Sequence, residues 1–250
     1  MELKGISKIA AIGLICALYS TKIVAQFSPS DSALYQKSIN NAVGLYFASI
    51  GDQLGLYNGN QYVPYSFPFK EAGHPFFNKE GLSAGSVVYN KVLYTDIQLL
   101  YDEVGDFVVF ADRFHRIKLI SERVTAFTLY NNNFIRIVKD SINPTLINTG
   151  FYNLLYEGKI TLLKKEIKAI SEDILSTTDG IVRFIRVKKY YYIKKNNNFY
   201  QLKRKKDLFE IFKDNKKEIQ QYIKTNKLSF KKDRDSLLAK VSAFYDQLTK

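Results

Sequence analysis

The sequence predicts an α+β protein, with an N-terminal helix, a curved antiparallel β-meander and basic helices at the C-terminus. Three observations predict this class. Apolar residues near the N-terminus and after residue 203 recur every three to four positions, which is the period of amphipathic helices. Between these regions, short aromatic and apolar runs alternate with turn residues, as in successive hairpins. With 250 residues and 46% hydrophobic content, the chain can bury a substantial core.

The first 25 residues have the three-part layout of a secretory signal peptide. MELKGISK carries two lysines, IAAIGLICALYS is apolar, and a small residue, Ala25, precedes Gln26. This apolar run is shorter than a membrane-spanning helix requires. We therefore expect export to the periplasm or cell envelope with cleavage after Ala25; an uncleaved N-terminal anchor is the alternative. Cys16 is the only cysteine, so the mature chain is expected to lack disulfides.

An amphipathic helix is expected from about residue 32 to 50. Its apolar residues, among them Ile39 and Val43, repeat every three or four positions. Ser30 or Asp31 is placed to cap its N-terminus, because both side chains carry oxygens that accept hydrogen bonds from the first backbone amides.

Hairpin units recur from about residue 56 to 203. LYNGNQYV (56–63) carries a central Asn-Gly, the strongest short hairpin signal, because both turn positions tolerate positive φ. Comparable units are VVYNKVLY (87–94), FTLYNNNFIRI (127–137), NLLYEGKITLL (153–163) and YYYIKKNNNFYQL (190–202), with two further strands in DIQLLYDEVGDFVVFAD (96–112) and one in HRIKLI (115–120). About ten strands in one sheet must curl, which predicts a half-barrel or a two-layer sheet.

The last hairpin unit is aromatic on both faces. Tyr190 and Tyr192 share one face of a strand, and Tyr191 and Ile193 share the other. We therefore expect the sheet to cover one face and the C-terminal helices to cover the other. Its lysines gather before, at and after the strands, which indicates a charged rim. A nucleic-acid surface would instead expose aromatics among lysines on one face, so no nucleic-acid partner is expected.

Helical periodicity returns at the C-terminus. A short helix is expected near Asp207, and a third helix after Asp233. Between them, Asn215 with Glu218 three residues later predicts a capping box at the start of the second helix.

The chain divides into a signal peptide (1–25), a helix-and-sheet domain (26–203) and a basic helical segment (204–250) packed on the sheet. Charge is distributed unevenly. Residues 26–150 hold 10 Lys and Arg against 11 Asp and Glu, whereas residues 151–250 hold 24 against 12. The balance of +12 in the second half predicts attraction to anionic surfaces.

The expected partner is an anionic envelope component, such as lipid phosphate or an acidic glycan, or an envelope protein; peripheral contact with the membrane fits the same charge. The candidate binding residues are Lys188, Lys189, Lys194, Lys195, Lys203, Arg204, Lys205 and Lys206.

Catalytic signatures are weak. GLSAG (81–85) matches the G-x-S-x-G motif of serine hydrolases, in which Ser83 and a later His115 would act with an acid between them. However, Ser83 precedes a strand-like run and no alternating βα pattern surrounds it. No catalytic residue is therefore assigned. The acids that fit the chain order are Asp102, Asp106 and Asp112.

No metal or cofactor is expected. His74 and His115 are far apart in sequence, the mature chain has no cysteine, and the phosphate-binding and dinucleotide motifs are absent. An acidic group lacks the pattern of a calcium loop and is interpreted as the solvated end of a hairpin. Its members are Asp96, Asp102, Glu103, Asp106 and Asp112.

An aromatic, proline-rich segment runs through YVPYSFPF (62–69) and GHPFF (73–77). Its prolines exclude it from a central strand. It is interpreted as a plug that closes the end of the sheet, with a binding lip for a glycan, lipid or peptide as the alternative. His74, Phe76 and Phe77 are its candidate binding residues.

Several blocks together resemble a group of exported proteins of unassigned function from Bacteroidetes-type bacteria. The blocks are LYNGNQYVPY, GHPFF, GSVVYNKVLYTDIQLLYDEVGDFVVF, IKLISERVTAFTL, GFYNLLYEGKITLL, KKEIQQYIKTNKLSF and FYDQL. The resemblance implies export to the envelope and assigns no functional residue.

The sequence thus predicts a non-enzymatic exported envelope protein that binds an anionic or envelope partner through its basic C-terminal half. A serine hydrolase using Ser83 and His115, or a carrier of an apolar ligand inside the curved sheet, are the alternatives.

Overall fold

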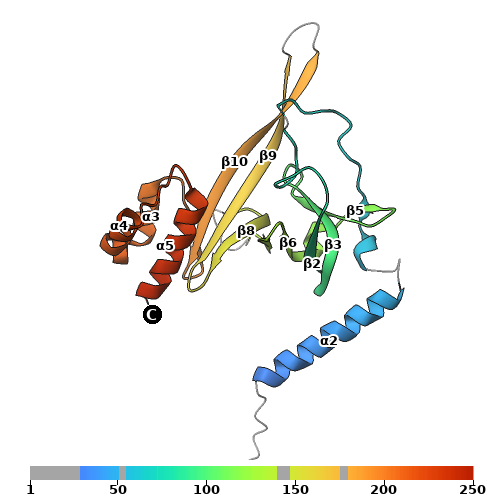
Figure 1. Cartoon of the computed structure of the whole chain (residues 1–250), viewed down its shortest axis with the longest axis horizontal. Coiled ribbons are helices and arrows are strands. Elements are labelled where there is room, and N and C mark those ends of the chain that lie inside the picture. The colour runs from blue at the N-terminus through green and yellow to red at the C-terminus, as the bar shows by residue number, and fades with distance from the viewer. Residues whose placement is uncertain (1–28, 51–54, 72, 140–146, 175–179, 250) are drawn as a thin grey trace, which may run out of the picture. The chain divides into compact units, whose positions relative to one another are not determined.

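The computed structural model describes residues 29–50, 55–71, 73–139, 147–174 and 180–249 (Figure 1). The expected signal peptide and its cleavage site lie outside these ranges. The chain divides into two compact units, residues 1–42 and 43–250. Helix α2 spans Pro29–Ile50.

The described residues of the second unit form one antiparallel sheet of eleven strands, as the sequence predicts for the class. The strands are β1 (Asn60–Gln61), β2 (Ser83–Tyr89), β3 (Val92–Asp102), β4 (Phe107–Ala111), β5 (Arg116–Lys118), β6 (Val124–Leu129), β7 (Asn132–Ile137), β8 (Gly150–Glu157), β9 (Thr161–Ile174), β10 (Ile181–Lys195) and β11 (Asn198–Gln201).

The sheet consists of two meanders joined side by side. Its strand order is β1-β5-β4-β3-β2-β6-β7-β8-β9-β10-β11, so β2 to β5 run outward in one direction and β6 to β11 in the other. The antiparallel pairing of β2 with β6 joins the two halves. The sheet is open, because β1 and β11 each have one paired neighbour.

Two-residue turns confirm three of the predicted hairpins. The turns at Asn90-Lys91, Tyr130-Asn131 and Asn196-Asn197 have positive φ at both positions. Such turns match the right-handed twist of the flanking strands, and asparagine adopts positive φ more readily than most residues. The predicted hairpin at 153–163 is also present, as β8 and β9.

The hairpin predicted at Asn58-Gly59 is wrong. Residues Gly55–Asn58 form a 3₁₀ helix, η3, and the next residues form β1, which pairs with β5. A Cβ atom on Gly59 would overlap the carbonyl oxygen of Lys118. The glycine therefore allows close approach between two backbones that are distant in sequence, and this contact overrides the local turn signal.

The sheet bends so that strands distant in the order meet. The rings of Tyr101 on β3 and Phe151 on β8 have centroids 6.0 Å apart, although β2, β6 and β7 lie between these strands. In a flat sheet four strand spacings would separate them by roughly 19 Å. Register shifts in β2, between Gly85 and Val87, and in β8, between Leu154 and Tyr156, supply irregularities at which a sheet bends.

Aromatic rings fill the inner side of this bend. Phe127 and Phe134 stack with centroids 4.5 Å apart, and Phe77 and Tyr101 both pack edge-on against Phe134. A cavity of only about 10 Å³ lies among these rings. The rings therefore form a closely packed part of the core.

The described C-terminal residues form three helices: α3 (Lys205–Ile211), α4 (Lys216–Thr225) and α5 (Arg234–Leu248). They share a buried apolar cluster with Leu162 on β9 and with Tyr191 and Ile193 on β10. The hydroxyl of Tyr191 donates to Asp235 at 2.6 Å on this side. On the opposite face the ring of Tyr192 meets Tyr152, with centroids 5.8 Å apart. The predicted cover by the C-terminal helices is confirmed for one face. On the other face Tyr192 is buried in a cluster with residues of the neighbouring strands.

A side-chain cap is present at α5 and lacking at α4. Asp233 accepts a hydrogen bond from the amide of Ser236 and caps α5. Asn215 makes no side-chain capping bond, so the capping box predicted for α4 is wrong. A 3₁₀ turn, η5 (Lys213–Asn215), leads directly into α4, so Asn215 does not adopt the extended conformation of a capping residue.

Strands β9 and β10 continue beyond their other neighbours as a two-stranded ribbon. β8 pairs with β9 only over residues 161–164, and β11 pairs with β10 only over residues 192–195. We call the remainder, residues 165–174 and 181–191, the hairpin arm (Figure 1, yellow and orange). Within the described ranges, no helix combines the length and apolar character needed to cross a membrane.

Candidate functional site

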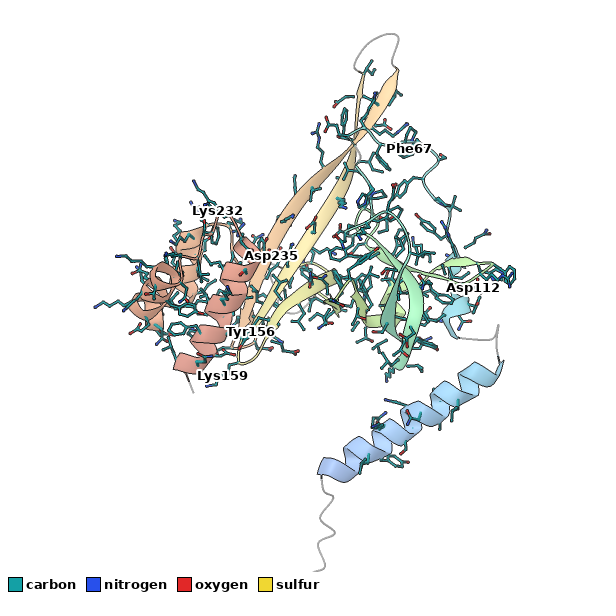
Figure 2. The ribbon with its side chains drawn as sticks, viewed as in Figure 1. Phe67, Asp112, Tyr156, Lys159, Lys232 and Asp235 are labelled. Carbon is teal, nitrogen blue, oxygen red and sulfur yellow. The ribbon has the colours of Figure 1, made fainter. Side chains whose placement is uncertain are left out.

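Exposed basic side chains gather on the helical segment. Residues 203–232 contain eleven lysines and arginines and four acids, and all eleven basic residues are exposed. We call this set the basic helical surface; Lys232 is one of its members (Figure 2). Among the described residues, only Arg204 of this set forms an ion pair, with Asp207 at 3.9 Å. Ten positive charges are therefore left without a neutralising partner in the fold.

Four of the candidate residues lie at the start of this surface. Lys203, Arg204, Lys205 and Lys206 lead into α3 and are all exposed. The amides of Lys203 and Arg204 donate to the carboxylate of Asp207 at 2.9 and 2.7 Å, and these bonds, led by that from Arg204, lower the pKa of Asp207. Asp207 thus fixes the entry of the basic segment into the helix.

The other four candidate lysines lie on β10 and differ in environment. Lys188 and Lys189 are exposed on the hairpin arm, and Lys189 pairs with Glu166 at 3.4 Å. Lys194 and Lys195 are half-buried at the base of the strand. Lys195 donates to the carbonyl of Ile211 and to Asp214, each at 3.2 Å, and so ties the helices to the sheet. The structure therefore gives Lys195 a structural role.

The aromatic segment connects three distant parts of the sheet. The amide of Tyr62 donates to the backbone carbonyl of Arg116 on β5, and the amide of Lys70 donates to the backbone carbonyl of Arg183 on the hairpin arm, each at 2.8 Å. The amide of Phe77 then donates to the backbone carbonyl of Tyr101 on β3 at 2.9 Å. The segment therefore crosses from the sheet edge to the arm and back to β3.

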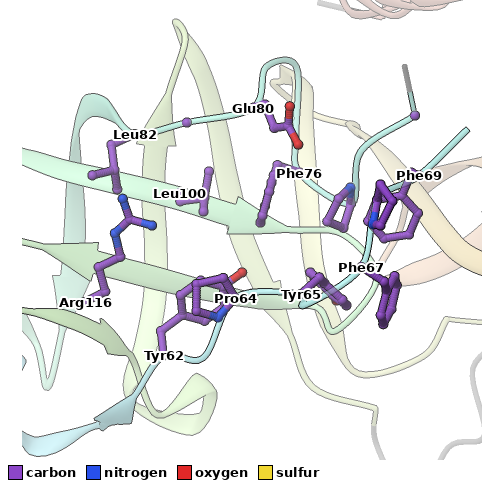
Figure 3. Close-up of a pocket in the computed structure, with 14 residues that line it drawn as sticks. Tyr62, Pro64, Tyr65, Phe67, Phe69, Phe76, Glu80, Leu82, Leu100 and Arg116 are labelled. Atoms are coloured by element: carbon purple, nitrogen blue, oxygen red, sulfur yellow. The ribbon is translucent and has the colours of Figure 1, made fainter. Parts of the chain in front are cut away.

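One side of this segment packs into the core, as expected of a plug, and the other side lines a pocket. Phe77 belongs to the packed inner core, where its ring lies 5.0 Å from that of Phe134. Phe76 instead lines a pocket of about 500 Å³ on the segment's other side (Figure 3). His74 stacks on Phe76, and burial, followed by the charge of Lys168, lowers the pKa of His74.

The pocket has an aromatic wall and two charged groups at its border. Figure 3 shows Arg116 at one end, Leu100 and Phe76 between, and Phe67 and Phe69 at the other end. The remaining lining residues are Tyr62, Pro64, Tyr65, Pro68, Gly73, Pro75, Glu80, Gly81 and Leu82.

Hydrogen bonds hold the aromatic wall in place. The hydroxyl of Tyr65 donates to Asp102 at 3.0 Å, and Asp102 also accepts from the amides of Val104 and Gly105. Burial raises the pKa of Asp102, and burial together with the Asp102 charge raises the pKa of Tyr62 to about 12. Burial likewise raises the pKa of Tyr65, so both tyrosine hydroxyls remain protonated at neutral pH. Tyr65 donates to Asp102, whereas the buried hydroxyl of Tyr62 has no hydrogen-bond partner in the described part of the chain.

A buried ionic cluster joins the β3–β4 turn to the hairpin arm. Lys165 donates to Asp106 at 2.5 Å, and Lys168 lies 3.2 Å from Glu103. Asp102 and Glu103 are buried, so the interpretation of this acidic group as a solvated hairpin end is wrong for them. The basic partners of Glu103 and Asp106 lie about sixty residues away in the sequence, and no local pattern reveals such pairs.

The hydrolase alternative lacks its geometry. Ser83, Leu99, Phe110 and Ile117 occupy matching positions on four neighbouring strands, so Ser83 and Ile117 are separated by three strand spacings, roughly 14 Å. His115 lies two residues from Ile117, is exposed, and contacts Asp112. A nucleophile and its base must lie within hydrogen-bond reach, and this arrangement does not bring them together.

Metal-binding geometry is also lacking in the described part of the chain, where no three His, Cys, Asp or Glu side chains are grouped to hold an ion. No protein-family model, no curated protein and no solved structure matches the chain. The resemblance to exported proteins of Bacteroidetes-type bacteria therefore stays a prediction.

Proposed function

We propose that this protein is a non-enzymatic exported envelope protein that binds an anionic envelope component through its basic helical surface. The observation that carries the proposal is the set of ten exposed, unpaired positive charges in residues 203–232. Export rests on the signal-peptide pattern of residues 1–25 and on the resemblance stated above.

The basic helical surface is a fixed platform. The rings of Phe212 and Tyr245 pack with centroids 4.4 Å apart, and those of Tyr222 and Phe244 stack at 4.1 Å. Because the helices are packed on one another and on the sheet, their lysines are displayed from a rigid base. Each lysine near an anionic membrane surface contributes about 1 kcal/mol of attraction, so several acting together give appreciable binding.

The proposal includes a half-barrel architecture for the sheet. The contact between Tyr101 and Phe151 across four strand spacings supports it. The rings of Phe77, Tyr101, Phe134 and Phe151 leave a cavity of only about 10 Å³ between them, which disfavours the carrier alternative at this place.

The proposal is tested by co-sedimentation of the mature chain, from Gln26 onward, with an envelope fraction at low and high salt. We expect binding that weakens as salt rises, because salt screens exposed charges. A variant with Lys213, Lys216, Lys217 and Lys224 changed to Gln should lose most of this binding. A chain that ends near residue 180 is not a suitable way to remove the basic helical surface, because it also lacks β10, which pairs with β9.

The matched control removes four exposed basic residues outside the surface. These are Lys79, Lys91, Arg113 and Lys139. An equal loss of binding in both variants would show that net charge alone acts, and binding that ignores salt and both variants would reject the proposal.

A further inference from the structure

The aromatic pocket beside residues 62–69 lies in a different part of the fold from the basic helical surface and has different chemistry. Its volume of about 500 Å³ falls within the range of small-molecule sites, about 300–1,000 Å³. We propose that this pocket is a binding site for a neutral oligosaccharide.

The apolar part of the pocket suits the faces of sugar rings. Leu100 and Phe76 lie between its two ends, and Tyr65, Phe67 and Phe69 form a wall of rings that pack edge-on with centroids 5.4 to 5.9 Å apart. Pyranose rings present C–H faces that pack on such apolar surfaces and carry hydroxyls around their rim. A ligand of this shape buries its faces on the wall and directs its hydroxyls outward.

The polar part of the pocket suits hydroxyl groups. Arg116 and Glu80 are exposed at its border, and neither side chain forms an ion pair or hydrogen bond within the described part of the chain. Arginine offers several donors in a planar fork, and a carboxylate offers two acceptor oxygens. Sugar hydroxyls both donate and accept, so separate hydroxyls of an oligosaccharide can pair with each of the two side chains.

The charge balance of the border favours a neutral ligand. Arg116 and Glu80 contribute one charge of each sign, so together they give neither an anion nor a cation a net electrostatic attraction to the pocket. A lipid chain would cover both groups without offering hydrogen bonds, and burying unpaired charged groups is costly. An oligosaccharide covers them while supplying partners.

The pocket is held in shape by contacts outside its lining. The guanidinium of Arg183 lies 4.2 Å from the centroid of Phe67, and the amide of Lys70 donates to the carbonyl of Arg183. Asp102 holds the hydroxyl of Tyr65. Such fixed walls reduce the conformational entropy lost when a ligand binds.

A glycan array with the mature chain, followed by calorimetric titration of the neutral sugars that bind, tests the proposal. Maltohexaose, cellohexaose, mannohexaose and hexa-N-acetylchitohexaose are the first probes. We expect binding of at least one neutral oligosaccharide, weakened by about tenfold or more in Arg116→Gln and in Glu80→Gln, since each removes a charged hydrogen-bonding group. Phe67→Ala tests the wall independently.

Arg113→Gln and Glu157→Gln are the matched controls, because both residues are exposed and lie outside the pocket lining. The controls should bind as the unmodified chain does. Absence of binding to every neutral sugar would overturn the proposal, as would binding that none of the pocket variants weakens. Capture of an apolar dye with no sugar binding would also overturn it and assign the pocket to an apolar ligand.

This inference and the proposed function can fail separately. Neither Arg116 nor Glu80 belongs to the basic helical surface, so both pocket variants should keep the salt-dependent binding to the envelope fraction. The lysine variants should likewise keep sugar binding.

Discussion

The carboxylate of Glu103 lies 3.2 Å from the ammonium of Lys168, and both side chains are almost fully buried. Lys168 also donates to the carbonyls of His74 and Phe76, at 3.2 and 2.5 Å. One ammonium therefore joins the end of β3, the hairpin arm and the aromatic segment. The position of the pocket wall depends on this junction.

Glu103 should make stability fall with rising pH. Burial, followed by the charge of Glu166, raises the pKa of Glu103 to about 7. The folded state holds this proton more tightly than the unfolded chain does. Its stabilising contribution is therefore complete below about pH 4.5 and is lost as the pH rises through about 7.

Urea unfolding of the unmodified chain and of Glu103→Gln checks this. Between about pH 5 and pH 8, the free energy of unfolding of the unmodified chain should fall on the order of 2 kcal/mol more than that of the variant. His74 titrates in both proteins, so the difference isolates Glu103. Equal pH slopes in the two proteins would contradict this assignment.

Loss of the Lys168 ammonium should be costly. Lys168→Met leaves the Glu103 carboxylate and two backbone carbonyls without a partner, and we expect destabilisation of about 3–5 kcal/mol by chemical denaturation. Lys188→Met is the control, because Lys188 is exposed on the same arm, and it should change stability by less than about 0.5 kcal/mol. Adding Glu103→Leu to Lys168→Met should restore part of the loss; a double variant less stable than Lys168→Met would argue against a buried ion pair.

Gly59 should resist substitution for a reason unrelated to turn formation. In Gly59→Ala the new methyl group meets the carbonyl of Lys118, and such overpacking costs about 1–3 kcal/mol. Asn58→Ala changes the exposed neighbouring residue and should have a smaller effect in the same thermal unfolding experiment. If both variants unfold at the same temperature, the close approach of β1 and β5 is wrong.

Asp235 should anchor α5 to the sheet. It accepts from Lys164 at 2.7 Å and from Tyr191 at 2.6 Å. Burial opposes its ionisation, but these two donors outweigh burial and lower the pKa of Asp235. Its stabilising contribution is therefore present at neutral pH and is lost as the pH falls through this lowered value.

Asp235→Ala should lower the free energy of unfolding by roughly 1.5–3 kcal/mol at neutral pH, and Tyr191→Phe by about 1 kcal/mol. Hydrogen exchange of the amides in α5 should increase more in Asp235→Ala than in Asp233→Ala, which removes only a cap. Unchanged exchange in α5 would show that the apolar cluster alone holds the helix.

Local signals in the sequence predict much of the sheet. Asn90-Lys91 and Asn196-Asn197 each form the turn that their residue types favour, because a two-residue turn depends on its own backbone angles. Asn58-Gly59 carries the strongest signal of this kind and forms no hairpin, since β5, distant in sequence, pairs with the residues that follow. A local rule fails where a long-range contact supplies more hydrogen bonds.

The sequence predicts which residue types make up the candidate sites, but it does not predict how those residues are arranged in space. The lysines of residues 203–206 are exposed as their charge suggests. The ammonium of Lys195 instead donates hydrogen bonds to the carbonyl of Ile211 and to Asp214. The aromatic segment is evident in the sequence, but its pocket also needs Leu100 and Arg116 from other strands. They meet because the aromatic segment is hydrogen-bonded to β5 at Tyr62 and to β3 at Phe77.

Binding of residues 26–250 to lipid vesicles tests directly whether the basic helical surface attracts an anionic membrane. The vesicles are phosphatidylcholine with or without phosphatidylglycerol, and the chains compared are the unmodified protein, the variant lacking Lys213, Lys216, Lys217 and Lys224, and the four-charge control. We expect binding to the anionic vesicles alone, weakened at least about tenfold in the variant lacking the four helical lysines and much less in the control. Equal binding to both vesicle types, or an equal loss in the two variants, would contradict it.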